Sequence, residues 1–305
     1  MKSLRIATRE SVLALKQTDI VKNAILKHFP DCEIILVPLT TTGDQLLDRS
    51  LATVGGKGLF IKELEKALLD NTADIAVHST KDIPAEITPG LTIAAYLDRE
   101  DPRDAFVSAK YAHLSQLPMG GIVGTASPRR ESMIKHIRPD INIKLLRGNV
   151  LTRIKKLESG EYDGIVLAAA GLKRLDLEHK VKHYFSLDES LPAIGQGVIA
   201  IECRENDAST QKIISLLDHS QTRACVSAER ALNKKLGGSC HAAIGGYAKY
   251  ENNKIILKAI VSSLDGKINY KSQSENSLEN SILLGNTVAD DLLSQGAYEL
   301  LASQI

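Results

Sequence analysis

The sequence predicts two similar α/β lobes followed by a smaller α+β domain. Short apolar stretches alternate with segments of helical periodicity, which is typical of sheets covered by helices. The layout of residues 58–79, a glycine, a helix, an aspartate and a buried strand, recurs in residues 148–169. Beyond residue 218, two strand patterns, a hairpin-like turn at 264–267 and a final helix near 287–302 predict an α+β domain. The whole chain has 305 residues, which is enough for two or three domains.

Composition excludes several classes of partner. Lys and Arg number 38 against 37 Asp and Glu, so nothing global favours nucleic acid or an anionic membrane. Aromatic residues make up 4% with no Trp, which argues against stacking platforms for single strands. The first residues lead straight into a strand pattern and no stretch reaches membrane-spanning length, so we expect a cytoplasmic protein.

The first lobe begins with a strand at residues 4–8, and Arg9 and Ser11 then open an amphipathic helix whose N-terminus favours anions. A strand at 33–39 follows, and then a long polar loop through residue 58 that is typical of a functional or mobile segment. A helix near 59–70 leads to the next strand. The strand core at 75–77 runs into Lys81 and Asp82 before Pro84 ends it, and another strand spans 91–96.

The second lobe begins after a charged, Pro-containing run at 98–104, which reads as a crossing between domains. A strand near 122–125 enters a helix that carries Arg129 and Arg130 in its first turn. Positive charge there opposes the helix dipole unless an anion compensates it, so the pair favours ligand binding. The alternative is two ordinary surface arginines. The chain returns near 192–196 to a strand at 198–202, and two such crossings form a hinge.

The repeated layout places basic residues in corresponding positions. Lys57 and Arg147 precede the glycines, and Lys62 and Arg153 lie near the starts of the paired helices. Two such lobes would face one another across a cleft, to which both offer cations and helix N-termini. Coincidence among generic helix–strand units is the alternative, since the identities are few, and the helix cations could simply be solvated.

Two kinds of chemistry stand out. Asp82 is the candidate acid beside Lys81, at a strand end where open α/β sheets bind ligands; the alternative is a pair that only solvates a loop. Several arginines and a lysine suggest a small molecule with many negative charges, because guanidinium groups match carboxylates and phosphates. These cations are Arg9, Lys57, Arg129, Arg130, Arg147, Arg153 and Arg174.

The four cysteines lie far apart with no Cys-x-x-Cys spacing, so neither a zinc site nor a disulfide framework is indicated. Cys32, Cys203 and Cys225 fall in strand or helix patterns and read as packing residues. Cys240 follows Gly237, Gly238 and Ser239 in a turn, where it could act as a nucleophile or as an attachment point. A cysteine hydrolase would need a base within reach, for which only the adjacent His241 is evident. A non-catalytic, two-lobed anion-binding protein is a further alternative.

The order of short motifs resembles the porphobilinogen deaminase (hydroxymethylbilane synthase) family along essentially the whole chain. The last motif leads on to Cys240. The motifs are residues 6–11 (IATRES), 55–60 (GGKGLF), 77–84 (VHSTKDIP), 99–104 (REDPRD), 123–130 (VGTASPRR), 146–149 (LRGN), 193–197 (AIGQG) and 228–231 (AERA).

This resemblance implies two lobes built like type II periplasmic binding proteins, namely 1–97 with 198–217 and 98–197, and a C-terminal domain at 218–305. It implies a transferase, expected to be monomeric, that carries a dipyrromethane cofactor joined by a thioether to Cys240. Four porphobilinogen units would be added to it head to tail with loss of ammonia, before hydrolysis releases hydroxymethylbilane.

The resemblance also assigns roles to residues. Asp82 would be the catalytic carboxylate, which holds pyrrole N–H groups and stabilises cationic intermediates. The cofactor's acetate and propionate groups would be held by Ser79, Lys81, Thr125, Ser127, Arg129 and Arg130. Substrate and the growing polypyrrole would be handled by Arg9, Ser11, Arg147, Arg153 and Arg174, with Lys57 on the loop above them. No metal is implied.

Three positions depart from the family pattern. Pro128 replaces an aliphatic residue, and either alters the turn before Arg129 or serves as a helix-start residue. Thr53 stands where many members have Lys, so one loop cation is absent. Ala242 and Ala243 replace the usual Val-Pro or Ile-Pro after the cysteine, which puts the rigidity of that turn in doubt.

Overall fold

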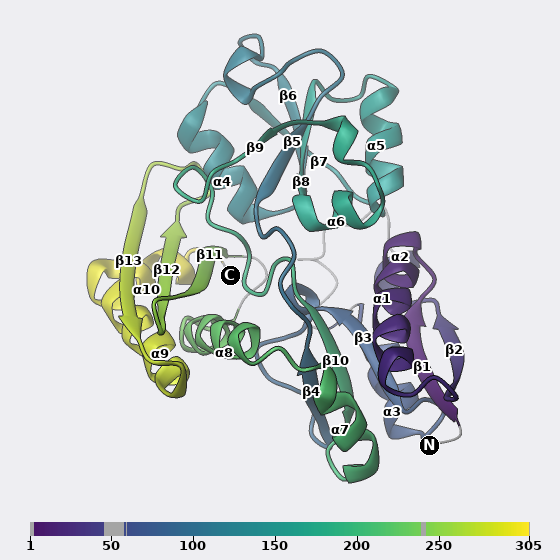
Figure 1. Ribbon diagram of the computed structural model, residues 1–305. Coiled ribbons are helices and arrows are strands. Elements are labelled where there is room, and N and C mark those ends of the chain that lie inside the picture. Colours follow the sequence, from purple (N-terminus) through teal and green to yellow (C-terminus); the bar gives the residue numbers. More distant parts are fainter. Residues whose placement is uncertain (1–2, 46–57, 59, 239–241, 305) are drawn as a thin grey trace. The chain divides into compact units, whose positions relative to one another are not determined.

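The computed structural model describes residues 3–45, 58, 60–238 and 242–304 (Figure 1). Lys57, Thr53, Cys240 and residues 46–57 of the predicted polar loop lie outside these residues. The chain separates into two compact units, Met1–Glu100 with Val198–Arg223, and Asp101–Gly197 with Ala224–Ile305. The two segments in which the chain was predicted to cross between lobes, near 98–103 and 192–196, lie next to the boundaries of these units. The division into three domains stays a prediction.

The first unit contains a five-stranded sheet in the order β2-β1-β3-β10-β4. The parallel strands are β1 (Ser3–Arg9), β2 (Glu33–Leu39) and β3 (Ile75–Ser79), while β10 (Ile199–Arg204) runs antiparallel to β3 and to β4 (Leu91–Tyr96). Its helices are α1 (Val12–His28), α2 (Thr42–Gln45), α3 (Lys62–Leu69) and α7 (Ala208–Ile214), with short 3-10 turns at Thr80–Asp82 and Ser215–Leu217. Every residue from Ile75 to His78 is buried, which is why β3 reads as a continuous apolar run rather than an alternating one.

The second unit contains a sheet with the corresponding order, β7-β6-β8-β5-β9. Its strands are β5 (Asp104–Val107), β6 (Ile122–Thr125), β7 (Asn142–Leu145), β8 (Gly164–Ala168) and β9 (Val181–Tyr184). Its helices are α4 (Pro128–Ile137), α5 (Val150–Glu158) and α6 (Ala169–Arg174), with 3-10 turns at Leu114–Gln116 and Glu178–Lys180. In both sheets three parallel strands are followed by two strands that complete the sheet, the first of them antiparallel to its neighbour.

The repeat predicted from the sequence is confirmed by matching hydrogen bonds. Asp74 precedes β3, and its carboxylate accepts from the backbone N–H of Arg5 at 2.8 Å. Asp163 precedes β8, and its carboxylate accepts from the backbone N–H of Ile122, also at 2.8 Å. In each sheet the aspartate therefore joins the start of the third parallel strand to the start of the first.

A three-stranded antiparallel sheet, in the order β11-β12-β13, completes the second unit. Its strands are β11 (Ala243–Glu251), β12 (Lys254–Ser262) and β13 (Asn269–Asn276), and the predicted turn at 264–267 joins the last two. Its core forms against α8 (Ser220–Lys235), α9 (Ser281–Leu292) and α10 (Tyr298–Ala302), with short turns at Leu278–Asn280 and Leu293–Ala297. The predicted final helix at 287–302 is thus longer, and Gly296, at φ 108°, interrupts it.

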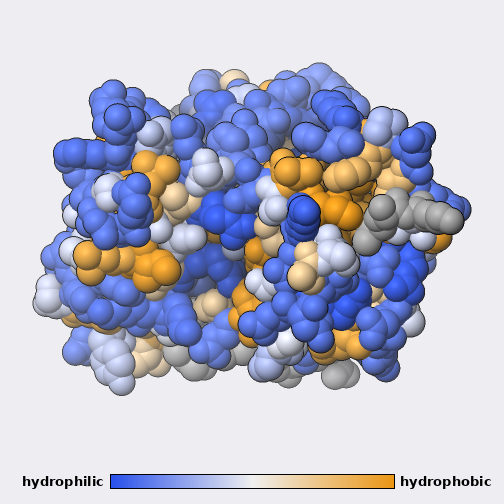
Figure 2. Space-filling model, turned by 60° about the horizontal axis from the view of Figure 1, so that its bottom comes forward, coloured by the Kyte–Doolittle hydropathy of each residue, from blue (hydrophilic) through white to orange (hydrophobic). Residues whose placement is uncertain are grey.

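The face of the molecule in Figure 2 is mainly hydrophilic, with separate hydrophobic patches. Among the described residues, no helix combines the length and the apolar character that crossing a membrane requires.

Candidate functional site

Asp82 and Lys81 lie at the carboxyl end of β3, in the 3-10 turn Thr80–Asp82, and both are exposed. Ser79 ends the strand and its hydroxyl lies 2.8 Å from Nε2 of Gln17 on α1. The backbone N–H of Thr80 donates to the carbonyl oxygen of Val198 at 3.0 Å, which ties this turn to the segment before β10. The turn is therefore anchored on two sides while its carboxylate and ammonium groups reach solvent.

Arg9 and Ser11 lie at the carboxyl end of β1, which pairs with β3 in parallel. The guanidinium carbon of Arg9 lies 4.4 Å from the ring centroid of Phe60, a cation–π contact. Ser11 is the N-cap of α1, and its hydroxyl oxygen accepts from the N–H of Ala14 at 3.3 Å. The first unit thus gathers Arg9, Ser11 and the Ser79–Asp82 turn at one edge of its sheet.

In the second unit, Thr125 is the last residue of β6 and Ser127 is the N-cap of α4. The hydroxyl oxygen of Thr125 accepts from the N–H of Ser127 at 3.1 Å, and Ser127 caps α4 by accepting from the N–H of Arg130 at 3.5 Å. Pro128 is the first residue of α4, so it serves as the helix-start residue that the sequence allowed. Both hydroxyl groups therefore help to form the turn that positions the two arginines.

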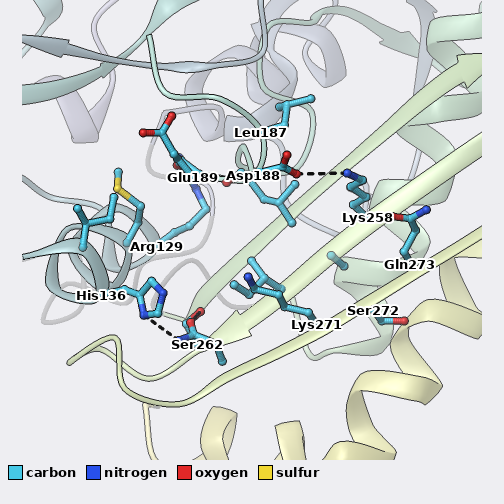
Figure 3. A pocket seen from close by; sticks show the side chains of 17 residues that line it. Arg129, His136, Leu187, Asp188, Glu189, Lys258, Ser262, Lys271, Ser272 and Gln273 are labelled. Atoms are coloured by element: carbon cyan, nitrogen blue, oxygen red, sulfur yellow. Dashed lines mark hydrogen bonds and ion pairs between the residues drawn. The ribbon is translucent and has the colours of Figure 1, made fainter. Parts of the chain in front are cut away.

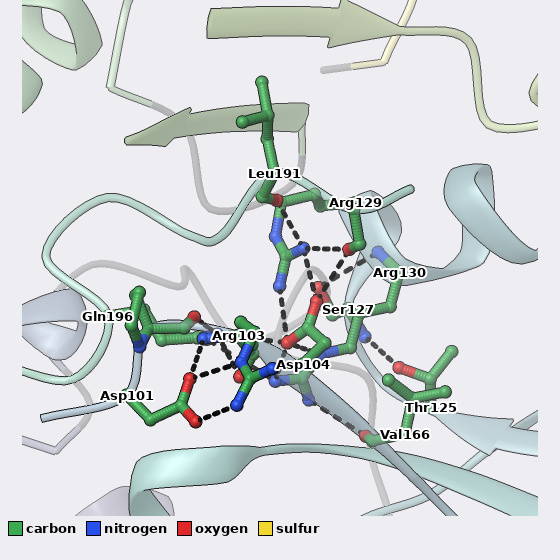
Figure 4. A network of polar contacts seen from close by, with 12 residues as sticks. Asp101, Arg103, Asp104, Thr125, Ser127, Arg129, Arg130, Val166, Leu191 and Gln196 are labelled. Atoms are coloured by element: carbon green, nitrogen blue, oxygen red, sulfur yellow. Dashed lines mark hydrogen bonds and ion pairs between the residues drawn. The ribbon is translucent and has the colours of Figure 1, made fainter. Parts of the chain in front are cut away.

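Arg129 and Arg130 are buried, and both contact the carboxylate of Asp104 at the start of β5 (Figure 4). Arg129 donates through Nη1 to Asp104 at 2.7 Å, and to the backbone oxygen of Leu191 at 2.7 Å. Arg130 donates to Asp104 through Nε at 3.0 Å and Nη2 at 2.8 Å. Its Nη1 donates to the backbone oxygen of Val166 at 3.0 Å. They are thus not solvated surface arginines; binding of cofactor carboxylates by them stays a prediction.

The electrostatics of this cluster keep Asp104 ionised. Burial alone would raise the pKa of Asp104, but the charges of Arg129 and Arg130 lower it well below the usual range. Burial lowers the pKa of Arg130, and the nearby charge of Arg129 adds to this, whereas Asp104 opposes it. The carboxylate is therefore the group that makes two buried guanidinium ions tolerable.

Three further arginines of the second unit lie near the carboxyl ends of its strands. Arg147 follows β7, and burial lowers the pKa of its guanidinium group; its Nε is buried without a hydrogen-bond partner among the described residues. Arg153 on α5 donates through Nε to the backbone oxygen of Gly148 at 2.7 Å. Arg174 at the end of α6 donates to the backbone oxygen of Gly197 at 2.7 Å.

This donor set fits a ligand that carries several carboxylates. Two partly desolvated cations, Arg129 and Arg147, each have a buried Nε that no described group satisfies. An unsatisfied buried donor is costly, so an added carboxylate oxygen would be stabilising at either position. Two helix N-termini, those of α4 and α5, lie at the same edge and favour anions as well.

A pocket of about 600 Å³ opens in the second unit between α4, residues 187–191 and the strands β12 and β13 (Figure 3). Arg129 forms part of its wall, together with His136 of α4 and Lys271 of β13. Asp188 and Lys258 form an ion pair of 3.4 Å across it. The pocket lies outside the residues assigned from the sequence except at Arg129.

Sequence reasoning missed the buried acids. Asp104 falls in the predicted crossing segment and in the motif 99–104, and Gln196, which donates to it at 3.0 Å, falls in the motif 193–197, but the sequence assigns neither residue a role in the site. In the first unit, His78 of β3 and Glu202 of β10 form a buried pair of 3.0 Å. A charged or polar residue next to or inside an otherwise apolar strand was the signal for Asp104, His78 and Glu202.

The described cysteines behave as predicted. Cys32, Cys203 and Cys225 are buried thiols outside any disulfide, and burial raises the pKa of the Cys203 thiol to about 11. They are packing residues. Within the described ranges, no group of three His, Cys, Asp or Glu side chains could hold a metal ion. Cys240 and Lys57 lie outside the described residues, so their roles stay predictions.

Solved structures of similar fold have low identity. A putative methionine-binding lipoprotein from Bacillus subtilis is 14% identical, covers 71% of this chain and 90% of its own, with a TM-score of 0.45. The methionine binding protein MetQ is 12% identical over 76% of this chain and 94% of its own, with a TM-score of 0.47. A nutrient binding protein from Burkholderia cenocepacia bound to methionine is 12% identical over 69% and 90%, with a TM-score of 0.45.

Two family models match most of the chain. The one described as "Porphobilinogen deaminase, dipyromethane cofactor binding domain" matches residues 4–212, and the one described as "Porphobilinogen deaminase, C-terminal domain" matches residues 223–294. Together they include every residue assigned to the site. The chain therefore belongs to the porphobilinogen deaminase family, transferases of tetrapyrrole synthesis that bind a dipyrromethane cofactor.

Proposed function

We propose that this chain is a hydroxymethylbilane synthase that works through the residues named above. It condenses four porphobilinogen units head to tail, releases one ammonia for each, and hydrolyses the product from the enzyme. The observation that carries this proposal is the match of both family domains in their expected order, residues 4–212 and then 223–294. When bound, the dipyrromethane supplies the terminal pyrrole to which the first substrate is joined.

Asp82 is the proposed catalytic carboxylate. It is exposed at the carboxyl end of β3, and within the described part of the chain its carboxylate makes no hydrogen bond or ion pair. A carboxylate without a protein partner can accept pyrrole N–H groups and stabilise a positive charge that develops as ammonia leaves. Lys81, next to it, is assigned to a carboxylate of the cofactor.

The remaining roles follow the charge of the ligands. Porphobilinogen and each pyrrole unit carry an acetate and a propionate group, which suit guanidinium donors. We assign the substrate and the growing polypyrrole to Arg9, Ser11, Lys57, Arg147, Arg153 and Arg174. We assign the cofactor carboxylates to Ser79, Lys81, Thr125, Ser127, Arg129 and Arg130, with Cys240 as the covalent attachment point.

The test is product stoichiometry. Purified protein is incubated with porphobilinogen, and ammonia and hydroxymethylbilane are quantified over time. We expect four ammonia molecules released for each hydroxymethylbilane formed. Binding of porphobilinogen without its consumption would instead support a non-catalytic anion-binding protein and would contradict the proposal.

We also propose a cytoplasmic monomer, supported by the resemblance to the family. Light scattering after gel filtration tests the monomer, since a dimer would double the mass.

A further inference from the structure

The cluster around Asp104 holds two positive charges and one negative charge in a buried environment. The side chains of Arg129 and Arg130 are each 7% exposed and that of Asp104 is 0% exposed. Two guanidinium ions and one carboxylate leave a net charge of +1. A buried charge without a partner is costly, whereas a buried charge with a hydrogen-bonded partner is tolerated.

The carboxylate of Asp104 has no capacity left for a second role. Its Oδ1 accepts from Arg129, from Arg130 twice and from Gln196 at distances of 2.8 to 3.2 Å. Its Oδ2 accepts from Arg129 at 2.7 Å and from the hydroxyl of Ser190 at 2.9 Å. With six donors on two oxygens, Asp104 is saturated.

The two arginines differ in whether all their side-chain nitrogens have a hydrogen-bond acceptor. Every side-chain nitrogen of Arg130 donates to a protein acceptor, namely Asp104 or the backbone oxygen of Val166. In Arg129, Nη1 and Nη2 donate, but Nε is buried and has no partner among the described residues. The missing acceptor of the cluster therefore lies at Arg129.

The position of the pair adds a second reason to expect an anion there. Arg129 and Arg130 occupy the first turn of α4, a ten-residue helix. Cations in a first turn oppose the helix dipole, and the only acidic residue of that turn is Glu131. Asp104 compensates for one of the two arginines, and within the described residues no second carboxylate accepts a hydrogen bond from either of them.

We propose that Asp104 is a positioning residue that acts as a built-in counter-ion. It supplies one of the two negative charges that Arg129 and Arg130 require and fixes their geometry, so that the pair takes up one ligand carboxylate, on the Arg129 side. The identity of the ligand rests on the proposed function; the cluster's preference for one more anion does not.

A thermodynamic cycle separates this role from a purely structural one. Asp104→Asn is compared with the parent in two backgrounds, the cofactor-loaded wild type and Cys240→Ala, and the melting temperature is measured for all four proteins. Removing the carboxylate raises the net charge of the cluster from +1 to +2. We expect the loss of melting temperature in the Cys240→Ala background to be at least twice that in the loaded protein, where ligand carboxylates compensate. Equal losses would overturn the proposal.

The matched control is Asp163→Asn. Asp163 belongs to the same unit and its carboxylate accepts a hydrogen bond from the backbone N–H of Ile122, but it precedes β8 at the opposite edge from the α4 N-terminus. The loss of melting temperature caused by Asp163→Asn should be the same in both backgrounds. A difference as large as that of Asp104→Asn would show that the cycle reports general stability, and would also overturn the proposal.

A second experiment uses inorganic phosphate as the probe, and it depends neither on the cofactor nor on whether Asp104→Asn folds well. In the Cys240→Ala background at constant ionic strength, phosphate should raise the melting temperature, because a ligand that binds only the folded state stabilises it. Arg129→Gln brings the cluster to zero net charge and should abolish at least half of that rise. An undiminished rise would contradict the proposal. If wild-type protein carries no cofactor, the proposed function fails, but this arm still decides the role of the cluster.

Discussion

The guanidinium Nη1 of Arg129 donates a 2.7 Å hydrogen bond to the carboxylate of Asp104, across 25 residues of sequence. The same nitrogen donates to the backbone oxygen of Leu191, so Arg129 joins the start of β5 and the first turn of α4 to the segment before Gly197, where the first stretch of this unit ends. The turn that holds Thr125 and Ser127 is therefore fixed by a buried charge rather than by apolar packing alone.

We predict that Asp104→Ala strongly destabilises the second unit. Breaking a buried ion pair costs about 3–5 kcal/mol, because the remaining charge is left uncompensated. Urea unfolding followed by circular dichroism measures this cost. Asp188→Ala is the control, since Asp188 is highly exposed and should cost under about 1 kcal/mol on removal. A cost for Asp104→Ala as small as that of the control would contradict the importance of the cluster.

Asp82→Asn should fold normally and retain the cofactor, but should turn over at least about 100-fold more slowly. The amide has nearly the same shape but cannot offer the negative charge that stabilises a developing cation. Product formation under saturating porphobilinogen gives kcat, and intact mass verifies that the variant is loaded. Glu86→Gln, on the exposed segment after β3, is the comparison. Near-wild-type kcat in Asp82→Asn would remove Asp82 from the mechanism.

Arg147→Leu should weaken the handling of substrate without unfolding the protein. The side chain is partly exposed, and its Nε has no partner among the described residues, so folding loses little when it is removed. A charge-assisted hydrogen bond to a carboxylate is worth about 1.5–3 kcal/mol, so we expect kcat/KM to fall by about 10- to 100-fold. Lys144→Gln, an exposed cation on β7, should leave kcat/KM unchanged. Unchanged kcat/KM and unchanged accumulation of enzyme intermediates in Arg147→Leu would count against its assignment.

Asp207 gives the stability a pH dependence of known sign. Burial alone would raise its pKa, but hydrogen bonds from Thr210, Ser209 and Arg204 lower the pKa to about 2, from the usual 3.8. A depressed pKa means that the carboxylate stabilises the fold above about pH 4 and that this contribution disappears as the pH falls through 2. At pH 7 it amounts to about 2 kcal/mol at most, because solvent screens this partly exposed group.

Asp207→Asn tests this because asparagine also caps helices well, so the comparison isolates the charge. The difference in unfolding free energy from wild type should be full at pH 7 and about half as large at pH 3. A difference that grows as the pH falls would have the wrong sign and would refute the assignment.

Much of the fold could be predicted because apolar runs and helix signals are local. The strand at 75–77, the helix opened by Ser11 and the turn at 264–267 all lie where the sequence placed them. The strands that the sequence did not predict are short or polar. The strands β5, β7 and β9 have four residues each, and β13 alternates polar residues along the edge of its sheet, so its apolar period is absent.

The site was predicted less completely, for a physical reason. Arg129 and Arg130 could be recognised as unusual from their place in a first helical turn. Asp104 stands out only as a charged residue beside an apolar strand; its pairing with the two arginines could not be predicted, because a buried ion pair depends on contacts between residues far apart in sequence. The same holds for His78 and Glu202, which meet only when β3 and β10 pair.

The central claim is that the chain carries a dipyrromethane on Cys240, and intact mass spectrometry tests it most directly. Protein is made in cells that supply porphobilinogen, as wild type and as Cys240→Ala, with Cys225→Ala as the control for a buried thiol. The account predicts that wild type and Cys225→Ala carry the mass of one dipyrromethane and that Cys240→Ala does not. An unmodified wild-type protein, or a modified Cys240→Ala protein, would contradict it.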